Sequence, residues 1–165
     1  MNKLKCLLVV AISAIAFAGC RSLVDVEYCY GAKVIIENKS SKDIKLDNSV
    51  NTMSNSAGIE HLDITLAPGE SYSFTRSGDS PGFAPASYIG NKCRVTFGDA
   101  VSVIHYDGFD NFEYLIEHSI CCEGSFQTET HQRNYTYTYT FTFTDADYDR
   151  AVEWNAKYGA THAAQ

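Results

Sequence analysis

The chain has 165 residues, enough for one domain of about 130–150 residues once a leader is removed. Hydrophobic residues make up 45% of the chain, charged residues 20% and aromatic residues 13%, which suits a folded core and argues against a disordered, collagen-like or polytopic membrane protein. The net charge of −7 argues against binding to a nucleic-acid backbone.

The first twenty residues have the parts of a bacterial export signal. They read MNKLKCLLVVAISAIAFAGC, in which two lysines precede an uncharged stretch from Cys6 to Ala18. That stretch is too short for a comfortable membrane span but suits a signal peptide. Small residues then precede Cys20. The segment resembles the lipobox of Gram-negative bacterial lipoproteins, although Phe17 stands where that family usually carries an aliphatic residue.

This resemblance implies a signal peptide over residues 1–19, an acylated Cys20 and a tether over residues 20–31. Each buried methylene of an acyl chain contributes about 0.8 kcal/mol, so two or more chains, palmitate among them, hold a domain durably on a membrane. Arg21 follows the cysteine and no Asp stands there, which by the same resemblance implies the outer membrane, on its periplasmic or its surface face. Cleavage removes two lysines and leaves a net charge of −9, so anionic head groups add nothing to the anchor.

Four further cysteines predict disulfides, namely Cys29, Cys93, Cys121 and Cys122. An exported chain meets an oxidising compartment, so up to two bonds are expected. A bond between the adjacent Cys121 and Cys122 would be strained, because neighbouring side chains on a strand point to opposite faces. We therefore expect Cys29 and Cys93 each to bond one of the adjacent pair, with each bond contributing roughly 2–4 kcal/mol.

A zinc site is the alternative use of these cysteines. His118, Cys121 and Cys122 would be joined by His131 or His105 as a fourth ligand. Adjacent cysteines do not reproduce the Cys-x-x-Cys spacing of zinc knuckles. We therefore expect disulfides, with no metal and no cofactor.

Alternating apolar residues and turn signals predict a series of short strands. The expected strands are residues 33–37, 44–46, 62–66, a return strand that begins at Tyr72, 93–97 and 101–106. The last two flank Gly98 and Asp99, which predict a β-hairpin with a two-residue turn. Loops are expected at residues 38–43, 48–58 and 78–92, whereas residues 107–118 fit either a strand or one helical turn.

The clearest element is residues 135–143, in which Tyr and Phe alternate with Thr. A period of two places every aromatic ring on one face and every Thr on the other. Residues 144–147 then resemble a capping box, and the acidic residues there suit the N-terminus of a short helix. We expect this helix to dock through Tyr148, Val152 and Trp154 and to end before Gly159, with residues 159–165 frayed.

Seven or eight strands and one late helix predict an all-β fold, an antiparallel β-sandwich over residues 32–158 with one short C-terminal helix. The phrases KVIIENKSSKDIKL and ITLAPGESYSF are similar to strand–turn phrases of immunoglobulin-like β-sandwich domains in bacterial lipoproteins. The similarity covers about residues 32–106 and implies an immunoglobulin-like arrangement. Fold alone implies no function.

The segment Gly78-Asp79-Ser80-Pro81-Gly82 matches the G-x-S-x-G pattern of serine hydrolases. That pattern needs a helix after the serine, and the prolines that follow argue against a regular helix. Acidic residues at 145, 147 and 149 imitate the start of a calcium loop, but the Gly and Glu that an EF-hand requires are missing. Helix capping explains these residues better, and an acidic turn explains the cluster at residues 107–111. We predict no catalytic residue.

The alternating aromatic segment offers a candidate binding site. Tyrosine rings stack on sugars and flat ligands, so we name Tyr135, Tyr137 and Tyr139 as candidate ligand-binding aromatics, against the alternative that they belong to the core with Phe141 and Phe143. An open aromatic face would mark a binding site.

These observations together predict a non-enzymatic, lipid-anchored binding or accessory module of the cell envelope. Its partner would be a glycan, a peptide or an envelope protein, besides the membrane that holds its lipid. The alternative is a small hydrolase or metal-dependent enzyme that uses Ser80 or the group His118, Cys121 and Cys122.

Overall fold

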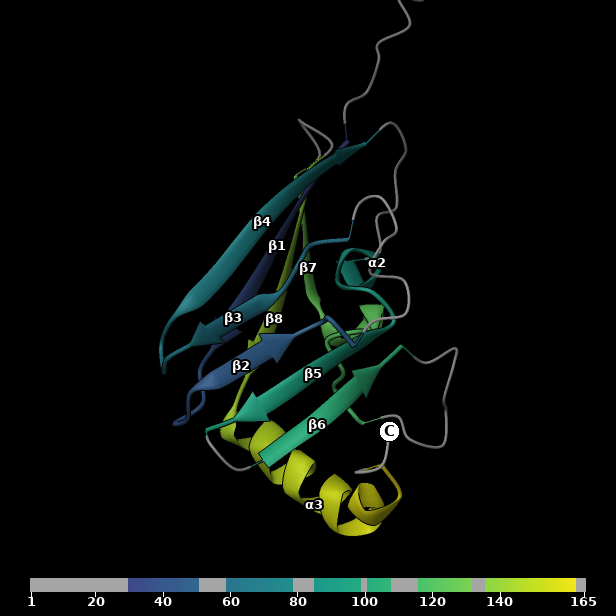
Figure 1. The fold of residues 1–165 in the computed structure, drawn as a ribbon. Helices are drawn as coiled ribbons and strands as arrows, with labels where there is room; N and C mark the ends of the chain where they lie inside the picture. Colours follow the sequence, from purple (N-terminus) through teal and green to yellow (C-terminus); the bar gives the residue numbers. More distant parts are fainter. Residues whose placement is uncertain are drawn as a thin grey trace, which may run out of the picture.

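The computed structural model of the chain describes residues 30–50, 59–78, 85–98, 101–107, 116–131 and 136–162. They form two four-stranded sheets packed face to face, with a long helix across one end of the pair (Figure 1). The predicted all-β sandwich with a C-terminal helix is confirmed.

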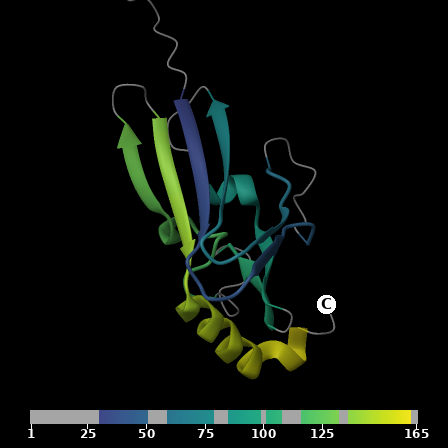
Figure 2. The same ribbon diagram turned by 90° about the vertical axis from the view of Figure 1, so that its left-hand side faces the viewer.

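The first sheet has the strand order β4-β1-β8-β7. Its strands are β1 (Tyr30–Asn38), β4 (Ser71–Gly78), β7 (Gln127–His131) and β8 (Thr136–Phe143). β1 pairs antiparallel with β4 but parallel with β8, so the sandwich contains one parallel pair among antiparallel ones. Figure 2 shows β1 and β8 side by side, each leading toward the end that carries the helix.

The second sheet is antiparallel throughout, with the order β3-β2-β5-β6. Its strands are β2 (Ile44–Asp47), β3 (Asp63–Leu66), β5 (Lys92–Phe97) and β6 (Val101–Tyr106). β5 and β6 form the predicted hairpin. The last paired residues of the hairpin are Phe97 and Val101, so its turn has three residues instead of the predicted two. The first of them, Gly98, has a φ of +56°, a conformation that favours glycine.

Buried Asn38 organises two of the places where the chain crosses between the sheets, the connections β1–β2 and β3–β4. Its Nδ2 donates to the main-chain oxygens of Lys42 and Leu66, both at 2.8 Å, and its Oδ1 accepts from the N–H of Ser40 at 2.9 Å. The N–H of Gly69 donates to the Asn38 carbonyl at 2.7 Å. The chain therefore turns a corner after β3, and the expected return strand, β4, pairs with β1 in the other sheet.

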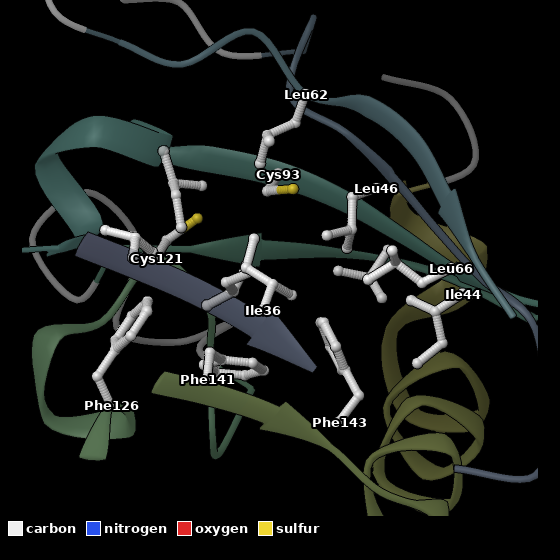
Figure 3. Packing of buried hydrophobic residues seen from close by; sticks show 14 of the residues in the cluster. Ile36, Ile44, Leu46, Leu62, Leu66, Cys93, Cys121, Phe126, Phe141 and Phe143 are labelled. Carbon is white, nitrogen blue, oxygen red and sulfur yellow. The ribbon is translucent and has the colours of Figure 1, made fainter. Parts of the chain in front are cut away.

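Alternating side chains of both sheets form a shared core (Figure 3). On β8, Tyr139, Phe141 and Phe143 are buried, whereas the threonines between them are only half-buried. The Phe143 ring meets that of Phe97 from the second sheet edge-on, with centroids 6.0 Å apart. The predicted separation of aromatic and Thr faces is confirmed for residues 136–143.

Helix α3 (Asp145–His162) spans 18 residues, so it is longer than expected and continues through Gly159. Ala151 and Trp154 are buried on its inner face, and the Tyr148 ring packs against that of Phe97 with centroids 6.0 Å apart. Val152 is 42% exposed, so its predicted docking role is wrong. The buried stripe follows Asp147, Ala151 and Trp154, which the helical period places on one face.

Two short helical segments complete the described fold, α2 (Pro85–Ile89) and the 3-10 turn η2 (Glu123–Ser125). The expectation that prolines prevent a helix near residues 83–86 is wrong for Pro85, which is the first residue of α2. Proline is tolerated there because the first helical N–H has no partner within the helix. Among the described helices, none is long and apolar enough to cross a membrane.

Candidate functional site

A polar cluster around Asp147 lies where β8 gives way to α3. The Asp147 carboxylate is 3% exposed and accepts hydrogen bonds from the N–H and hydroxyl of Thr144 at 2.7 and 3.0 Å and from Nη1 of Arg150 at 2.9 Å. It also contacts Nδ1 of His118 at 2.7 Å. Burial raises the pKa of Asp147, but the hydrogen bonds from His118 and Thr144 outweigh burial and hold the pKa below its ordinary value. The carboxylate is therefore ionised near neutral pH.

These contacts give the outcome of the capping prediction. The carboxylate of Asp147 bonds the N–H of Thr144, as a capping box requires. In a capping box the hydroxyl of the first residue also accepts the N–H of the third helical residue. Here the Thr144 hydroxyl instead donates to the Asp147 carboxylate. Asp145 accepts from the N–H and hydroxyl of Ser41, both at 2.8 Å, so it ties α3 to the β1–β2 connection. Asp147 therefore caps the helix as predicted, whereas Asp145 bonds Ser41 of the β1–β2 connection instead of the helix N-terminus.

His118 is held in an unusual backbone conformation. Its φ is +63°, in the left-handed region that costs a non-glycine residue roughly 1–2 kcal/mol. The ring lies flat against Phe141, with centroids 4.4 Å apart and planes 16° apart. Because ionised Asp147 only accepts hydrogen bonds, Nδ1 of His118 carries the proton. The stacking and this bond fix the orientation of the ring.

His118 borders a shallow hollow of about 360 Å³, which we call the histidine hollow. It is lined by Glu117, His118, Gly124, Ser125, Thr144 and Arg150. An imidazole oriented by a carboxylate can accept a proton as a general base. Among the described residues, however, no hydroxyl or thiol hydrogen-bonds this ring. The arrangement has two members of a nucleophilic triad and suits recognition of a polar group.

A larger hollow is lined in part by Tyr148 of α3. It encloses about 590 Å³, and we call it the lysine hollow. It is lined by Lys42, Asp43, Lys45, Thr65, Thr96, Phe97, Gly98 and Tyr148. Nζ of Lys42 lies 4.4 Å from the centroid of the Tyr148 ring. Charged groups, hydroxyls and aromatic rings together suit a ligand with both polar and apolar surfaces.

The three cysteines that the structure describes have free thiols, and Cys29 lies outside the described residues. Cys93 and Cys121 are buried, whereas Cys122 is half-buried. Burial raises the pKa of the Cys93 thiol to about 12 and that of Cys121 well above its ordinary value. The Cys121 thiol donates to the main-chain oxygen of His105 at 3.4 Å.

The alternative zinc ligands whose side chains are described, His105, His118, Cys121 and Cys122, do not form a metal-binding group, and the side chain of His131 lies outside the description. The His118 ring is bonded to Asp147, and the imidazole of buried His105 accepts the N–H of Ile120 at 3.1 Å. Burial lowers the pKa of His105 to about 3, so this ring is neutral. Across the part of the chain that the structure describes, no three His, Cys, Asp or Glu side chains are grouped as metal ligands.

The candidate aromatic residues occupy different environments. Tyr139 is 5% exposed and belongs to the core. Tyr137 is half-buried and stacks on Tyr139, with centroids 6.1 Å apart. Tyr135, Cys20 and Ser80 lie outside the described residues. Of the three tyrosines, Tyr137 is therefore the one shown to be partly open to a ligand.

Sequence reasoning missed the contact between His118 and Asp147. The two residues are 29 positions apart, and each had a separate interpretation, as a zinc ligand and as a helix cap. A carboxylate at the third position of the helix was the available signal, but no sequence pattern identifies its distant partner. No known family model and no curated protein matches the chain, so the residues themselves carry the functional argument.

Proposed function

We propose that this chain is a lipid-anchored protein of the bacterial cell envelope, most consistent with the outer membrane, and that its β-sandwich is a non-enzymatic binding or accessory module. The support for the anchor is the leader of residues 1–20, with its lysines, apolar stretch and lipobox-like cysteine. The same compartment supports disulfide formation among the remaining cysteines.

The observation that carries the binding proposal is the separation between the anchored end and the two hollows. β1 and β8 run parallel from the pair Gly31–Thr136 to the pair Asn38–Phe143. Seven steps of about 3.3 Å place the far pair roughly 23 Å along the sheet. Thr144, which borders the histidine hollow, follows β8 directly, and Figure 1 shows α3 at the end opposite the start of β1. A chain tethered ahead of Tyr30 presents both hollows away from the membrane.

The lysine hollow supports a glycan or a peptide as the ligand, displayed either free or on another envelope protein. The Tyr148 and Phe97 rings offer apolar surface, and the hydroxyls of Thr65 and Thr96 offer hydrogen bonds. Lys42 and Lys45 line this hollow together with Asp43, and Nζ of Lys45 also pairs with the Asp63 carboxylate at 3.3 Å. Sugars and peptides both combine such apolar and hydrogen-bonding surfaces.

The anchor is tested by the intact mass of the mature protein extracted from membranes. We expect a chain that begins at Cys20 and carries acyl groups, and we expect the Cys20→Ala variant to lack them and to leave the membrane fraction. An unmodified mature chain that begins elsewhere would refute the anchor.

The binding end is tested with the detergent-solubilised mature protein on arrays of bacterial glycans and peptides. We expect a ligand whose binding falls at least tenfold in the double variant Lys42→Ala, Lys45→Ala, a loss of about 1.4 kcal/mol. Lys33→Ala is the matched control, because Lys33 is an exposed lysine on β1, outside both hollows. Binding that is unchanged in the double variant Lys42→Ala, Lys45→Ala but is weakened in the control Lys33→Ala would contradict the proposed site.

A further inference from the structure

We propose that Cys93 and Cys121 form a buried disulfide in the exported protein, joining β5 to the segment that precedes η2. The proposal rests on the proposed function, because it requires an oxidising compartment. It also narrows the pairing that the sequence left open.

Both thiols lie in the core around the same residue of β6. Cys93 is 0% exposed and Cys121 is 1% exposed, and Figure 3 shows both side chains in the interior between the sheets. Cys93 is the cross-strand partner of His105, and opposed residues of antiparallel strands have Cα atoms about 4.5–5.5 Å apart. The Cys121 thiol reaches the main-chain oxygen of His105 at 3.4 Å. A single β6 residue, His105, is therefore a neighbour of both cysteines.

The structure favours Cys121 over its neighbour for this bond. The Cys122 side chain is half-buried rather than enclosed in the core, and its thiol donates to the main-chain oxygen of Tyr106 at 3.5 Å. Cys121 lies in a turn closed by a hydrogen bond from the N–H of Cys122 to the Ser119 carbonyl at 3.0 Å, and of the two cysteine side chains only that of Cys121 is buried. Cys122 is therefore the thiol that stays available to reagents or to another cysteine.

The bond forms by thiol–disulfide exchange with an external disulfide, the class of oxidant that envelope oxidases supply. The thiolate of one cysteine attacks that disulfide and releases one thiol, and the second cysteine then attacks the mixed disulfide and releases the other. The protein loses two protons and two electrons, and the oxidant gains them as two thiols. Burial raises the pKa of both cysteines, and thiolates are the reacting species, so the exchange takes place before the core closes.

The test is differential labelling of the mature protein extracted from membranes. The protein is denatured in N-ethylmaleimide without reductant, then reduced and treated with iodoacetamide. Cleavage after glutamate separates the cysteines, with Cys29 in residues 28–37, Cys93 in residues 71–113 and the adjacent pair in residues 118–123. We expect Cys93 to carry the second label, and residues 71–113 to be linked to residues 118–123 before reduction.

Two matched variants identify the partner of Cys93. Cys122→Ala should keep the linked peptides, whereas Cys121→Ala should abolish them. Closing a loop of about 30 residues should also raise the Tm of the oxidised wild-type protein by roughly 10 °C over the reduced protein. Cys93 alkylated by the first reagent in the wild type, or a link that survives Cys121→Ala, would overturn the proposal.

The same digest separates this proposal from the proposed anchor. Residues 20–27 carry Cys20 alone, so acylation is observed on a different peptide from the disulfide. An acylated Cys20 with free Cys93 would refute the disulfide and leave the anchor standing. A linked Cys93 with an unmodified Cys20 would refute the anchor and leave the disulfide standing.

Discussion

Removal of the Asp147 carboxylate should destabilise the end of the sandwich that carries α3. Its oxygens accept two hydrogen bonds from Thr144 and bond the His118 and Arg150 side chains, while the group itself is 3% exposed. Loss of one partner from a buried ion pair costs about 3–5 kcal/mol. His118 and Arg150 keep side-chain exposures of 29% and 35%, so water compensates them in part. We expect Asp147→Ala to lower the free energy of unfolding by about 3 kcal/mol.

Urea unfolding followed by tryptophan fluorescence measures this loss directly. Trp154 is the single tryptophan of the chain and is 8% exposed on the same helix, so its emission reports unfolding of α3. The urea dependence should be unchanged and the midpoint lowered, as for a pure loss of stability. Asp149→Ala is the matched control, because Asp149 is exposed two residues away, and it should stay within about 0.5 kcal/mol of the wild type. A loss for Asp147→Ala no larger than for this control would refute the reasoning.

The pH dependence gives the same prediction a second measurement. The pKa of Asp147 is lower in the folded chain than its ordinary value, and an unfolded Asp has a pKa of about 3.9. The ionised Asp147 carboxylate therefore contributes its full stabilisation above the pKa that Asp147 has in the unfolded chain. This contribution disappears as the pH falls through the pKa that Asp147 has in the folded chain. The difference in stability between the wild type and Asp147→Asn should narrow below about pH 4. A difference that stays constant down to pH 2 would contradict the ionised carboxylate.

Three further substitutions test other parts of the fold. Buried His105 has a pKa of about 3 in the folded chain against about 6.5 when unfolded, so the free energy of unfolding should fall by up to about 1.4 kcal/mol per pH unit below pH 6.5. In His105→Gln, urea unfolding at several pH values should show a weaker dependence of this free energy on pH, by the equivalent of one proton. Asn48→Ala should cost about 2–3 kcal/mol in urea, because Asn48 makes three buried or partly buried main-chain hydrogen bonds, whereas Asn155→Ala should cost under about 1 kcal/mol. Ala151→Leu should cost about 1–3 kcal/mol by overpacking the inner face of α3, while Val152→Leu should leave the Tm unchanged. The first prediction would be contradicted if His105→Gln showed the same pH dependence of stability as the wild type. The second would be contradicted if Asn48→Ala and Asn155→Ala lost equal stability, and the third if Ala151→Leu left the stability unchanged.

The strands could be predicted because their side chains alternate, but their partners could not. The Tyr and Thr alternation identified β8 and its buried face, since a period of two follows from strand geometry alone. The same periodicity is silent about which strand lies beside which. β4 was expected to return along β3, yet it joins β1 in the other sheet, because the corner is held by the side chain of Asn38. That asparagine stands in a stretch that composition marks as an ordinary polar loop.

The candidate site could be predicted only where its contacts are local in sequence. Thr144 and Asp147 are three residues apart, so the capping pattern was visible. His118 comes from a distant segment in an unfavourable backbone conformation, and a strained histidine has no sequence signature. The zinc interpretation grouped His118 with Cys121 by spacing. The structure instead directs the His118 ring to Asp147 and the Cys121 thiol to the main chain of β6.

The contacts of α3 make the proposed binding end rigid. Asp147 ties the helix to His118, Asp145 ties it to the β1–β2 connection, and Asn155 donates to the Ser102 oxygen of β6 at 3.0 Å. These bonds hold the start of the helix and its middle in place. Tyr148 of α3 lines the lysine hollow, and Arg150 of α3 lines the histidine hollow. A wall that is already ordered loses little entropy when a ligand binds. Asp147→Ala should therefore weaken ligand binding in the lysine hollow as well, although Asp147 does not line that hollow.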